Sequence, residues 1–141
     1  MKKLLLLSAL LLAGMFSASA QYQRRVLVEE FTNASCPPCA GQNPGFNAIL
    51  HDNLSKITPI KYQTNWPGYD PMNVQNAAHV ATRVAYYGVT GVPNGFTDGV
   101  GITNDCNYYD NAPACLDASD IDALYTVTSP VNIVLTHSIT A

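Results

Sequence analysis

The feature that most constrains the fold of this chain is a change of hydrophobic period around two closely spaced cysteines. Residues 25–31 (R-V-L-V-E-E-F) hold a continuous apolar run, which predicts a buried strand of the parallel-sheet kind. After Cys39 the apolar residues recur at helical spacing and predict a helix over residues 38–54, with a kink at Pro44 because proline removes a backbone donor. The two cysteines therefore lie between a strand and the first turn of a helix.

The same alternation of strands and helices continues along the chain. Residues 57–63 predict a second strand and residues 76–87 predict a second helix, for which Gly88 is a suitable C-cap. Residues 89–97 predict a turn that enters a third strand, and residues 117–125 predict a short final helix. Strands that alternate with helices predict an α/β fold with a central sheet flanked by helices.

The first twenty residues predict a secretory signal peptide that is not part of the fold. Two lysines precede an apolar run over residues 4–12, and the small-residue site A-S-A follows at residues 18–20. A membrane anchor is the alternative, but the apolar run is shorter than the roughly 20 residues that span a bilayer. We therefore expect residues 1–20 to be removed and the chain to be exported.

The charge of the chain and its cysteines indicate which partners it can bind and in which compartment it works. The chain has 7 basic and 10 acidic residues, and no Lys or Arg follows Arg83. A protein that binds nucleic acid would need a basic face, so we expect no nucleic-acid partner. All 4 cysteines follow the signal peptide, and export would place them where disulfides form and persist.

The end of the sequence predicts a change of domain. Pro130 breaks the pattern, and residues 131–139 then alternate like a strand with one wet face. We expect residues 21–129 to form the main domain. Residues 130–141 would begin a truncated β-rich domain, of which this strand is the first, so that the sequence would be a fragment.

The C-P-P-C motif at residues 36–39 admits several chemical interpretations. A zinc site would need a second ligand pair, and Cys106 and Cys115 lack the spacing of a zinc ribbon. A c-type haem site would need histidine directly after the motif, where Ala40 stands. A structural disulfide and a redox-active pair both remain, and no metal is expected.

The position of the motif at the start of a helix supports a redox-active pair. The helix dipole and the free N–H groups of the first turn stabilise a thiolate on Cys36, and a thiolate is the nucleophile of disulfide exchange. We expect Cys36 to attack, as the more exposed cysteine, and Cys39 to resolve the mixed disulfide. Pro38 suits the first helical turn, whereas Pro37 cannot donate a backbone hydrogen bond to the sulfur.

Three segments resemble the thioredoxin superfamily. The stretch V-L-V-E-E-F-T-N-A-S-C-P-P-C at residues 26–39 is similar to its strand and active-site segment, Pro44 matches the proline that kinks its helix, and G-V-T-G-V-P-N from Gly88 resembles its cis-proline loop. The segments E-E-F-T-N and W-P-G-Y-D-P-M are similar to exported, outer-membrane-related thioredoxin-like proteins of Bacteroidota. The resemblance implies a thioredoxin-like central sheet and a location in the periplasm, at the outer-membrane surface or outside the cell.

The resemblance also implies roles for residues near the cysteines. Glu30 falls at the position of a buried acid that exchanges a proton with Cys39; the alternative is that Glu29 faces inward, because strand alternation lets only one of the two do so. Pro93 would follow a cis bond, although an X-Pro bond by itself favours trans and an ordinary turn proline is the alternative. A cis bond would leave the backbone of Val92 to pair with an extended substrate.

The sequence departs from the superfamily pattern beside the motif. Ser35 stands where an aromatic residue usually precedes the first cysteine, and the segments 65–72 and 104–118 look inserted. Trp66 is expected to contact substrate, and the alternative is that it only packs beneath its loop. These departures leave the identity of the substrate open.

Together these features predict an exported protein thiol-disulfide oxidoreductase that requires no metal or organic cofactor. Its partners would be proteins with cysteine pairs and a redox partner protein. Cys106 and Cys115 are expected to form a separate, structural disulfide. The alternative is a non-catalytic, thioredoxin-like binding or structural domain of a larger cell-surface protein, in which the disulfide at residues 36–39 only cross-links the chain.

Replacing Pro37 by glycine tests whether the missing N–H limits thiolate formation at Cys36. Because glycine restores a backbone donor beside the sulfur, we expect Pro37→Gly to lower the pKa of the reduced Cys36 thiol relative to the wild type. A thiolate titration of both proteins measures this difference. An unchanged or higher pKa in the variant would show that the missing donor has no effect.

Overall fold

A computed structural model describes residues 22–103, 105–134, 136 and 138 of the chain. The predicted signal peptide, residues 1–20, lies outside the described residues. Residues 25–126 form one compact unit, and the segments on either side of it belong to a second unit. The unit at residues 25–126 contains all four cysteines.

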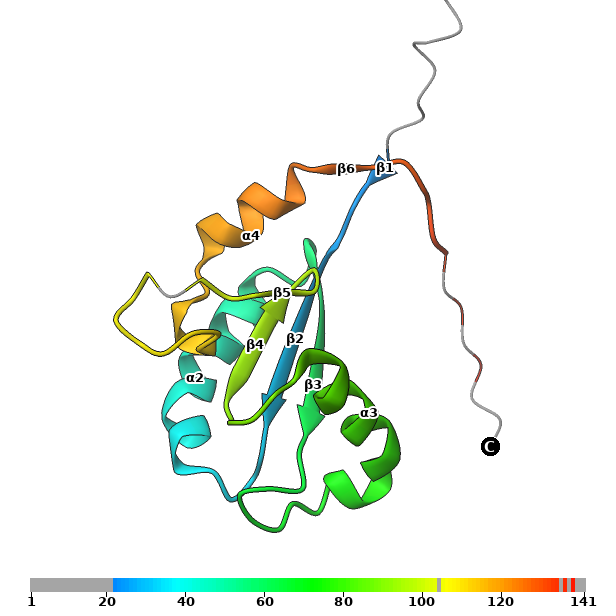
Figure 1. Cartoon of the computed structure of the whole chain (residues 1–141). Coiled ribbons are helices and arrows are strands. Elements are labelled where there is room, and N and C mark those ends of the chain that lie inside the picture. The colour runs from blue at the N-terminus through cyan, green and yellow to red at the C-terminus, as the bar shows by residue number, and fades with distance from the viewer. Residues whose placement is uncertain (1–21, 104, 135, 137, 139–141) are drawn as a thin grey trace, which may run out of the picture. The chain divides into compact units, whose positions relative to one another are not determined.

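A four-stranded sheet lies at the centre of this unit (Figure 1). Its strands are β2 (Val26–Thr32), β3 (Ile57–Gln63), β4 (Asn94–Thr97) and β5 (Val100–Gly101), in the order β3-β2-β4-β5. β2 pairs in parallel with β3 and antiparallel with β4, which pairs antiparallel with β5. The fold is therefore mixed α/β, as the alternation of hydrophobic periods predicted, and β3 covers the predicted residues.

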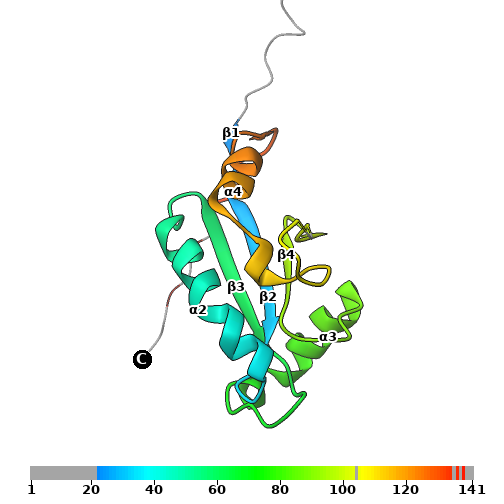
Figure 2. The same ribbon diagram turned by 90° about the vertical axis from the view of Figure 1, so that its left-hand side faces the viewer.

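Helices cover both faces of the sheet (Figure 2). α2 (Pro37–Asp52) and α4 (Ala118–Tyr125) pack on one face, and α3 (Ala77–Tyr87) packs on the other. Two short 3₁₀ turns, η1 (Asn73–Gln75) and η2 (Pro113–Cys115), lie in the connections. The predicted helices are confirmed to within two residues at their ends. In the part of the chain that the structure describes, no helix is long and apolar enough to cross a membrane.

Side-chain alternation along β2 divides the core into two layers. Val26 and Val28 face α2 and α4, where Phe46 and Ile121 belong to the same cluster. Phe31 faces α3. The second cluster consists of Phe31, Val89 and Phe96, with the half-buried Tyr62, Trp66, Val84, Tyr87 and Val92 packed against it. β2 is therefore buried on both faces, which is the physical reason for its continuous apolar run.

Residues with capping or turn preferences lie at the ends of several helices and strands. Gly88 ends α3 with φ of 63°, in the left-handed region that glycine adopts without steric cost. Asp117 caps α4, because its carboxylate accepts backbone N–H groups of the first turn in a capping box. Asp98 and Gly99, with φ of 50° and 84°, form the tight turn between β4 and β5.

The second unit contains one pair of short strands. β1 (Tyr22–Gln23) pairs antiparallel with β6 (Thr128–Ser129). The strand predicted over residues 131–139 is not formed at residues 131–134, which belong to no helix or strand, and part of the remainder lies outside the described residues. An alternating pattern makes a strand only where a neighbouring strand completes its backbone hydrogen bonds. The expected β-rich domain, like the boundary before it, stays a prediction.

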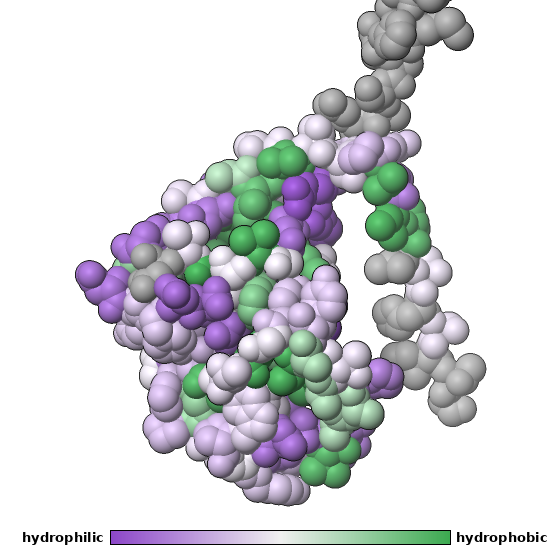
Figure 3. All heavy atoms as spheres, viewed as in Figure 1, coloured by the Kyte–Doolittle hydropathy of each residue, from purple (hydrophilic) through white to green (hydrophobic). Residues whose placement is uncertain are grey.

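A second disulfide fixes the segment that follows β5. Cys106 and Cys115 are bonded with Cα atoms 5.3 Å apart, as the sequence predicted. Cys115 is buried in the cluster on the α2 face, and Cys106 packs against that cluster. Hydrophilic residues gather over this segment on the face shown in Figure 3. The disulfide therefore attaches a polar loop to the core.

Removing this second disulfide is expected to lower stability. A ring of about ten residues restricts the unfolded chain by about 2–3 kcal/mol, so the double variant Cys106→Ala/Cys115→Ala should lose that much free energy of unfolding. Urea unfolding of the variant and the wild type measures the difference. A loss well below about 1 kcal/mol would mean that the core already holds the loop in place without the bond.

Candidate functional site

The Cys36–Cys39 disulfide lies at the N-terminus of α2. Cys36 is the N-cap residue, and Pro37 and Pro38 occupy the first turn, where their missing N–H groups are not needed. The two Cα atoms are 5.2 Å apart. Cys36 Sγ accepts a hydrogen bond from the Cys39 N–H at 3.1 Å. The same donor can stabilise a thiolate on Cys36 in the reduced protein.

Both cysteines are buried in this oxidised state. Cys36 is 4% exposed and Cys39 is 1% exposed, so Cys36 is the more exposed of the pair, as expected, although both are nearly inaccessible. Part of its cover is the Val92 carbonyl, whose oxygen lies 3.5 Å from Cys36 Sγ. A disulfide sulfur has no proton, so this is a contact. The thiol of the reduced protein can donate a hydrogen bond to that oxygen.

Hydrogen bonds connect the loop that carries Val92 to α2, the helix that begins at the cysteine motif. Its Val92–Pro93 peptide bond is cis, as the resemblance implied. The Pro93 carbonyl accepts from the Tyr109 hydroxyl at 2.7 Å, and that hydroxyl accepts from Gln42 Nε2 of α2 at 3.0 Å. Gln42 Oε1 accepts in turn from the Ala114 N–H at 3.1 Å. The segment after β5 therefore holds the proline loop against α2.

A second loop fixes the turn that precedes Cys36. The Ser35 hydroxyl donates to the Tyr69 carbonyl at 2.7 Å, so the residue that replaces the usual aromatic one binds this loop. The Ala34 N–H donates to Asp70 Oδ2 at 2.8 Å, and Asp70 is buried. These bonds position the backbone that leads from β2 into the motif.

Trp66 lies in the same loop and is half-buried. It packs against the cluster around Phe31 on the α3 face, and Val92 packs against that cluster as well. Its peptide bond to Pro67 is cis, which the sequence did not lead us to expect. The packing alternative for Trp66 is therefore supported, and its contact with substrate stays a prediction.

Glu30 is buried on the α2 face, at 1% exposure. Lys61 lies opposite it on β3, with Nζ 2.5 Å from Glu30 Oε2. When the Asn43 amide is oriented to accept from the Thr32 hydroxyl, its Nδ2 donates to Glu30 Oε1 at 2.5 Å and to the Cys39 carbonyl at 3.3 Å. Burial raises the pKa of Glu30 above its ordinary value of 4.5, and Lys61 opposes part of this rise. A carboxyl suited to holding a proton is thus linked to Cys39.

Glu29 faces the opposite side of the sheet and is also buried, at 0% exposure. The expectation that only one of the two glutamates faces inward is therefore wrong, because helices cover both faces of β2. The Glu29 carboxylate accepts from the hydroxyls of Tyr62 and Tyr87 and lies 2.8 Å from Arg83 Nη2. Burial alone would raise the pKa of Glu29, but these donors together outweigh it and hold the pKa below 4.5.

Three side chains around the site, Lys61, Asn43 and Tyr109, were not predicted from the sequence. Lys61 had a usable signal, because a single lysine within a strand beside a buried strand is a candidate partner for a buried acid. Asn43 and Tyr109 had none, since their contacts exist only after the helix and the loop have docked.

The candidate site is a disulfide and its surroundings. Among residues 22–138, as far as the structure describes them, no group of three or more His, Cys, Asp or Glu side chains is placed to hold a metal ion. The four cysteines are joined instead in two disulfides. The arrangement of Cys36, Cys39, Val92 and Glu30 can support thiol-disulfide exchange, in which no metal is required.

Glu29 and Glu30 are expected to respond to pH in opposite ways. The raised pKa of Glu30 means that the folded state holds its proton more tightly, so its contribution to stability falls as pH rises from 4.5 through the folded pKa. The lowered pKa of Glu29 gives a contribution that is present above 4.5 and lost as pH falls through the folded pKa.

We therefore expect Glu29→Gln to destabilise the protein most near neutral pH, and Glu30→Gln to destabilise it least there. Urea unfolding of the wild type and both variants across roughly pH 4 to 8 measures these differences. The two neighbouring variants control for each other, because both replace a buried carboxylate by an amide of the same shape. Parallel pH dependence of the two would contradict the assignment.

Comparisons with known proteins give no family for this chain. No protein-family model, no curated protein and no solved structure matches it. Its function is therefore inferred from the mixed α/β fold and from the contacts of the Cys36–Cys39 disulfide, and the resemblance to thioredoxins stays a prediction from the residues that carry it.

Proposed function

We propose that this chain is an exported protein thiol-disulfide oxidoreductase with a thioredoxin-like fold. The observation that carries the proposal is the contact between Cys36 Sγ of the disulfide and the Val92 carbonyl, beside a cis bond to Pro93. The Val92 N–H has no hydrogen-bond partner among the described residues. A free backbone segment next to a helix-terminal sulfur is suited to pair with an extended substrate.

The order of the elements supports the proposed fold. β2 leads through the cysteine motif into α2, β3 returns parallel to β2, and α3 covers the opposite face. The cis proline precedes the antiparallel pair β4 and β5, and α4 follows. The three segments that resemble thioredoxins fall within this succession.

The exchange can be written with the disulfide as the oxidant. A substrate thiolate attacks Cys36 Sγ, the Cys36–Cys39 bond breaks, and Cys39 leaves as a thiolate that takes the proton held by Glu30. The second substrate thiolate attacks the substrate sulfur of the mixed disulfide, and Cys36 leaves as a thiolate stabilised by the Cys39 N–H. The substrate loses two electrons and gains a disulfide, and the chain is left with Cys39 as a thiol, Cys36 as a thiolate and Glu30 ionised. The reverse sequence reduces a substrate.

Location and partners follow from this chemistry. Two disulfides support an oxidising compartment, which agrees with the predicted signal peptide. After each turnover a redox partner protein must restore the starting state by exchange through its own cysteine pair. The substrates are proteins with cysteine pairs, and the exchange steps need no metal or organic cofactor.

One observation favours the alternative, a non-catalytic binding or structural domain. Cys36 and Cys39 are both nearly inaccessible in the oxidised state, as inert structural disulfides are. In that case the bond would only cross-link the start of α2, and the domain would act through what it binds. The reactivity of the two cysteines distinguishes these functions.

A redox titration of the purified, processed chain in glutathione buffers tests the proposal. Differential alkylation and peptide mass spectrometry follow each cysteine, and the Cys106–Cys115 pair serves as an internal structural control. We expect a Cys36–Cys39 potential between about −120 and −270 mV and rapid alkylation of reduced Cys36. A potential below about −300 mV, or slow alkylation, would make the pair structural.

A further inference from the structure

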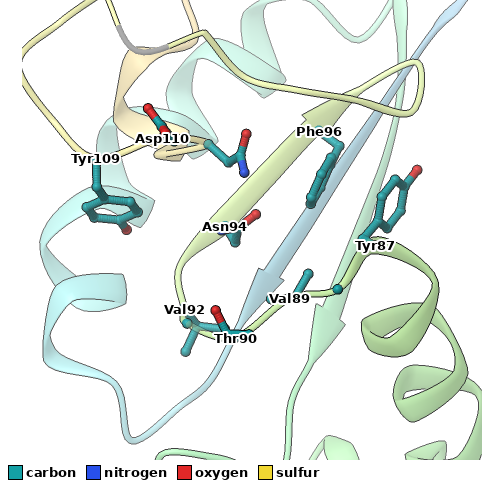
Figure 4. A pocket seen from close by; sticks show the side chains of 11 residues that line it. Tyr87, Val89, Thr90, Val92, Asn94, Phe96, Tyr109 and Asp110 are labelled. Atoms are coloured by element: carbon teal, nitrogen blue, oxygen red, sulfur yellow. The ribbon is translucent and has the colours of Figure 1, made fainter.

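A pocket of about 570 Å³ opens beside β4, and both the loop after α3 and the segment after β5 contribute to its walls (Figure 4). Val92, whose carbonyl contacts Cys36 Sγ at 3.5 Å, is one of the lining residues from the loop. Tyr109 is a lining residue from the segment after β5. The open space beside the Val92 backbone is therefore bordered by a residue of a different segment.

The backbone around Val92 has little hydrogen bonding of its own. Residues 90–93 lie between the end of α3 and the start of β4 and belong to neither. Among the described residues, their backbone takes part in one hydrogen bond in the oxidised state, which the Tyr109 hydroxyl donates to the Pro93 carbonyl at 2.7 Å. The Val92 side chain packs against the cluster around Phe31, and Pro93 is buried. Packing thus fixes these two side chains, whereas the orientation of their peptide groups depends on the bond from Tyr109.

The direction of each hydrogen bond in this link follows from groups that have only one role. A carbonyl only accepts, so the Tyr109 hydroxyl donates to Pro93, and its oxygen accepts from Gln42 Nε2 at 3.0 Å. A backbone N–H only donates, so the Ala114 N–H, 3.1 Å from Gln42 Oε1, fixes the orientation of the buried Gln42 amide. The four residues therefore form one chain of hydrogen bonds with a single order of donors and acceptors.

The Cys106–Cys115 disulfide encloses two members of this chain. Tyr109 and Ala114 both lie within the ring that the bond closes. Ala114 is adjacent to Cys115, which is buried in the cluster on the α2 face, so the core fixes this end of the ring. Tyr109 is exposed, so burial does not hold it against Pro93. Its position depends on how the ring is attached.

The ring is attached differently on the two sides of Tyr109. After this residue, the Asn111 carbonyl accepts from the Gly95 N–H of β4 at 2.8 Å. Before it, residues 105–108 make no hydrogen bond to other described residues, and the disulfide of Cys106 is their covalent attachment to the core. Opening this disulfide therefore frees one side of Tyr109, while the other side stays attached to β4.

The orientation of the Val92 backbone affects large and small substrates differently. Hydrogen bonds weaken steeply when donor and acceptor turn out of line, so a peptide group that turns freely pairs less well with an extended polypeptide. A small dithiol has no polypeptide backbone and does not use these groups. A residue that orients the Val92 backbone therefore acts on exchange with polypeptides alone.

We propose that Tyr109 is a positioning residue for exchange with polypeptide substrates, and that the Cys106–Cys115 disulfide supports exchange at Cys36–Cys39 through it. The Tyr109 hydroxyl holds the Val92–Pro93 peptide groups in the orientation with which an extended substrate pairs. The proposal rests on the proposed exchange activity. It gives the second disulfide a part in how the first one meets its substrate.

Replacing Tyr109 by phenylalanine removes the hydroxyl and keeps the ring. For the oxidised wild type and variant, one rate constant is measured with an extended dithiol peptide and another with dithiothreitol. We expect Tyr109→Phe to slow the reaction with the peptide about two- to tenfold, the range of one hydrogen bond, and not to slow the reaction with dithiothreitol. Alkylation and mass spectrometry at each time point confirm that the Cys106–Cys115 bond stays closed.

Tyr108→Phe is the matched control. Tyr108 lies in the same ring, is exposed, and its hydroxyl makes no hydrogen bond among the described residues. This variant should leave both rate constants unchanged. For Tyr109→Phe, equal slowing with the peptide and with dithiothreitol would indicate a general distortion of the site and would overturn the positioning role. An unchanged rate with the peptide would overturn it as well.

A double-mutant cycle tests whether the second disulfide acts through Tyr109. Cys106→Ala/Cys115→Ala should also slow the reaction with the peptide and not the reaction with dithiothreitol. Combined with Tyr109→Phe it should add little, because both changes release the same hydrogen bond. Effects that multiply independently, or no effect of the cysteine variant, would contradict the link. Cys106→Ala/Cys115→Val, which keeps a branched apolar side chain at the buried position, replaces the alanine variant if that variant does not fold.

The two proposals fail in different ways. If the wild type reacts with the peptide and Tyr109→Phe reacts equally fast, the proposed function stands and only the positioning role is overturned. If the wild type reacts with dithiothreitol but with no peptide, the proposed function is overturned, and the positioning role with it.

Discussion

Burial of β2 on both faces is the constraint on which the rest of the site depends. Because helices cover both sides of this strand, consecutive residues face two separate interiors, and the carboxylates of Glu29 and Glu30 are both removed from water. Each carboxylate then needs its own cation, Arg83 from α3 and Lys61 from β3. The number of donors differs between the two faces, so the pKa of one is lowered and that of the other is raised.

The three segments around the motif act together to position Cys36. The loop after β3 binds the turn through Ser35, and the loop after α3 covers the sulfur with Val92. The segment after β5 joins the latter loop to α2 through Tyr109. None of these segments is a strand or a long helix, so their arrangement depends on side-chain hydrogen bonds and on the sheet that supports them.

Burial of the disulfide also decides how a substrate must approach. Because the Cys36 residue is only 4% exposed, its sulfur is open to attack from few directions, and an attacking sulfur must reach it past neighbouring backbone. The contact with Val92 is therefore central to the proposed function, since the same residue borders the disulfide and the pocket beside β4.

The sequence by itself determined the mixed α/β class, the positions of the three helices and of β2 and β3, the two disulfides and the cap at Gly88, because hydrophobic period, cysteine spacing and capping chemistry act over short distances. Only the tertiary structure decided that both glutamates are buried, that Cys36 is covered, and that residues 131–134 form no strand. These outcomes depend on which elements pack together. The burial of a residue, its hydrogen-bond partners and its pKa depend on the residues packed around it in the fold. A pattern along one segment does not contain that information.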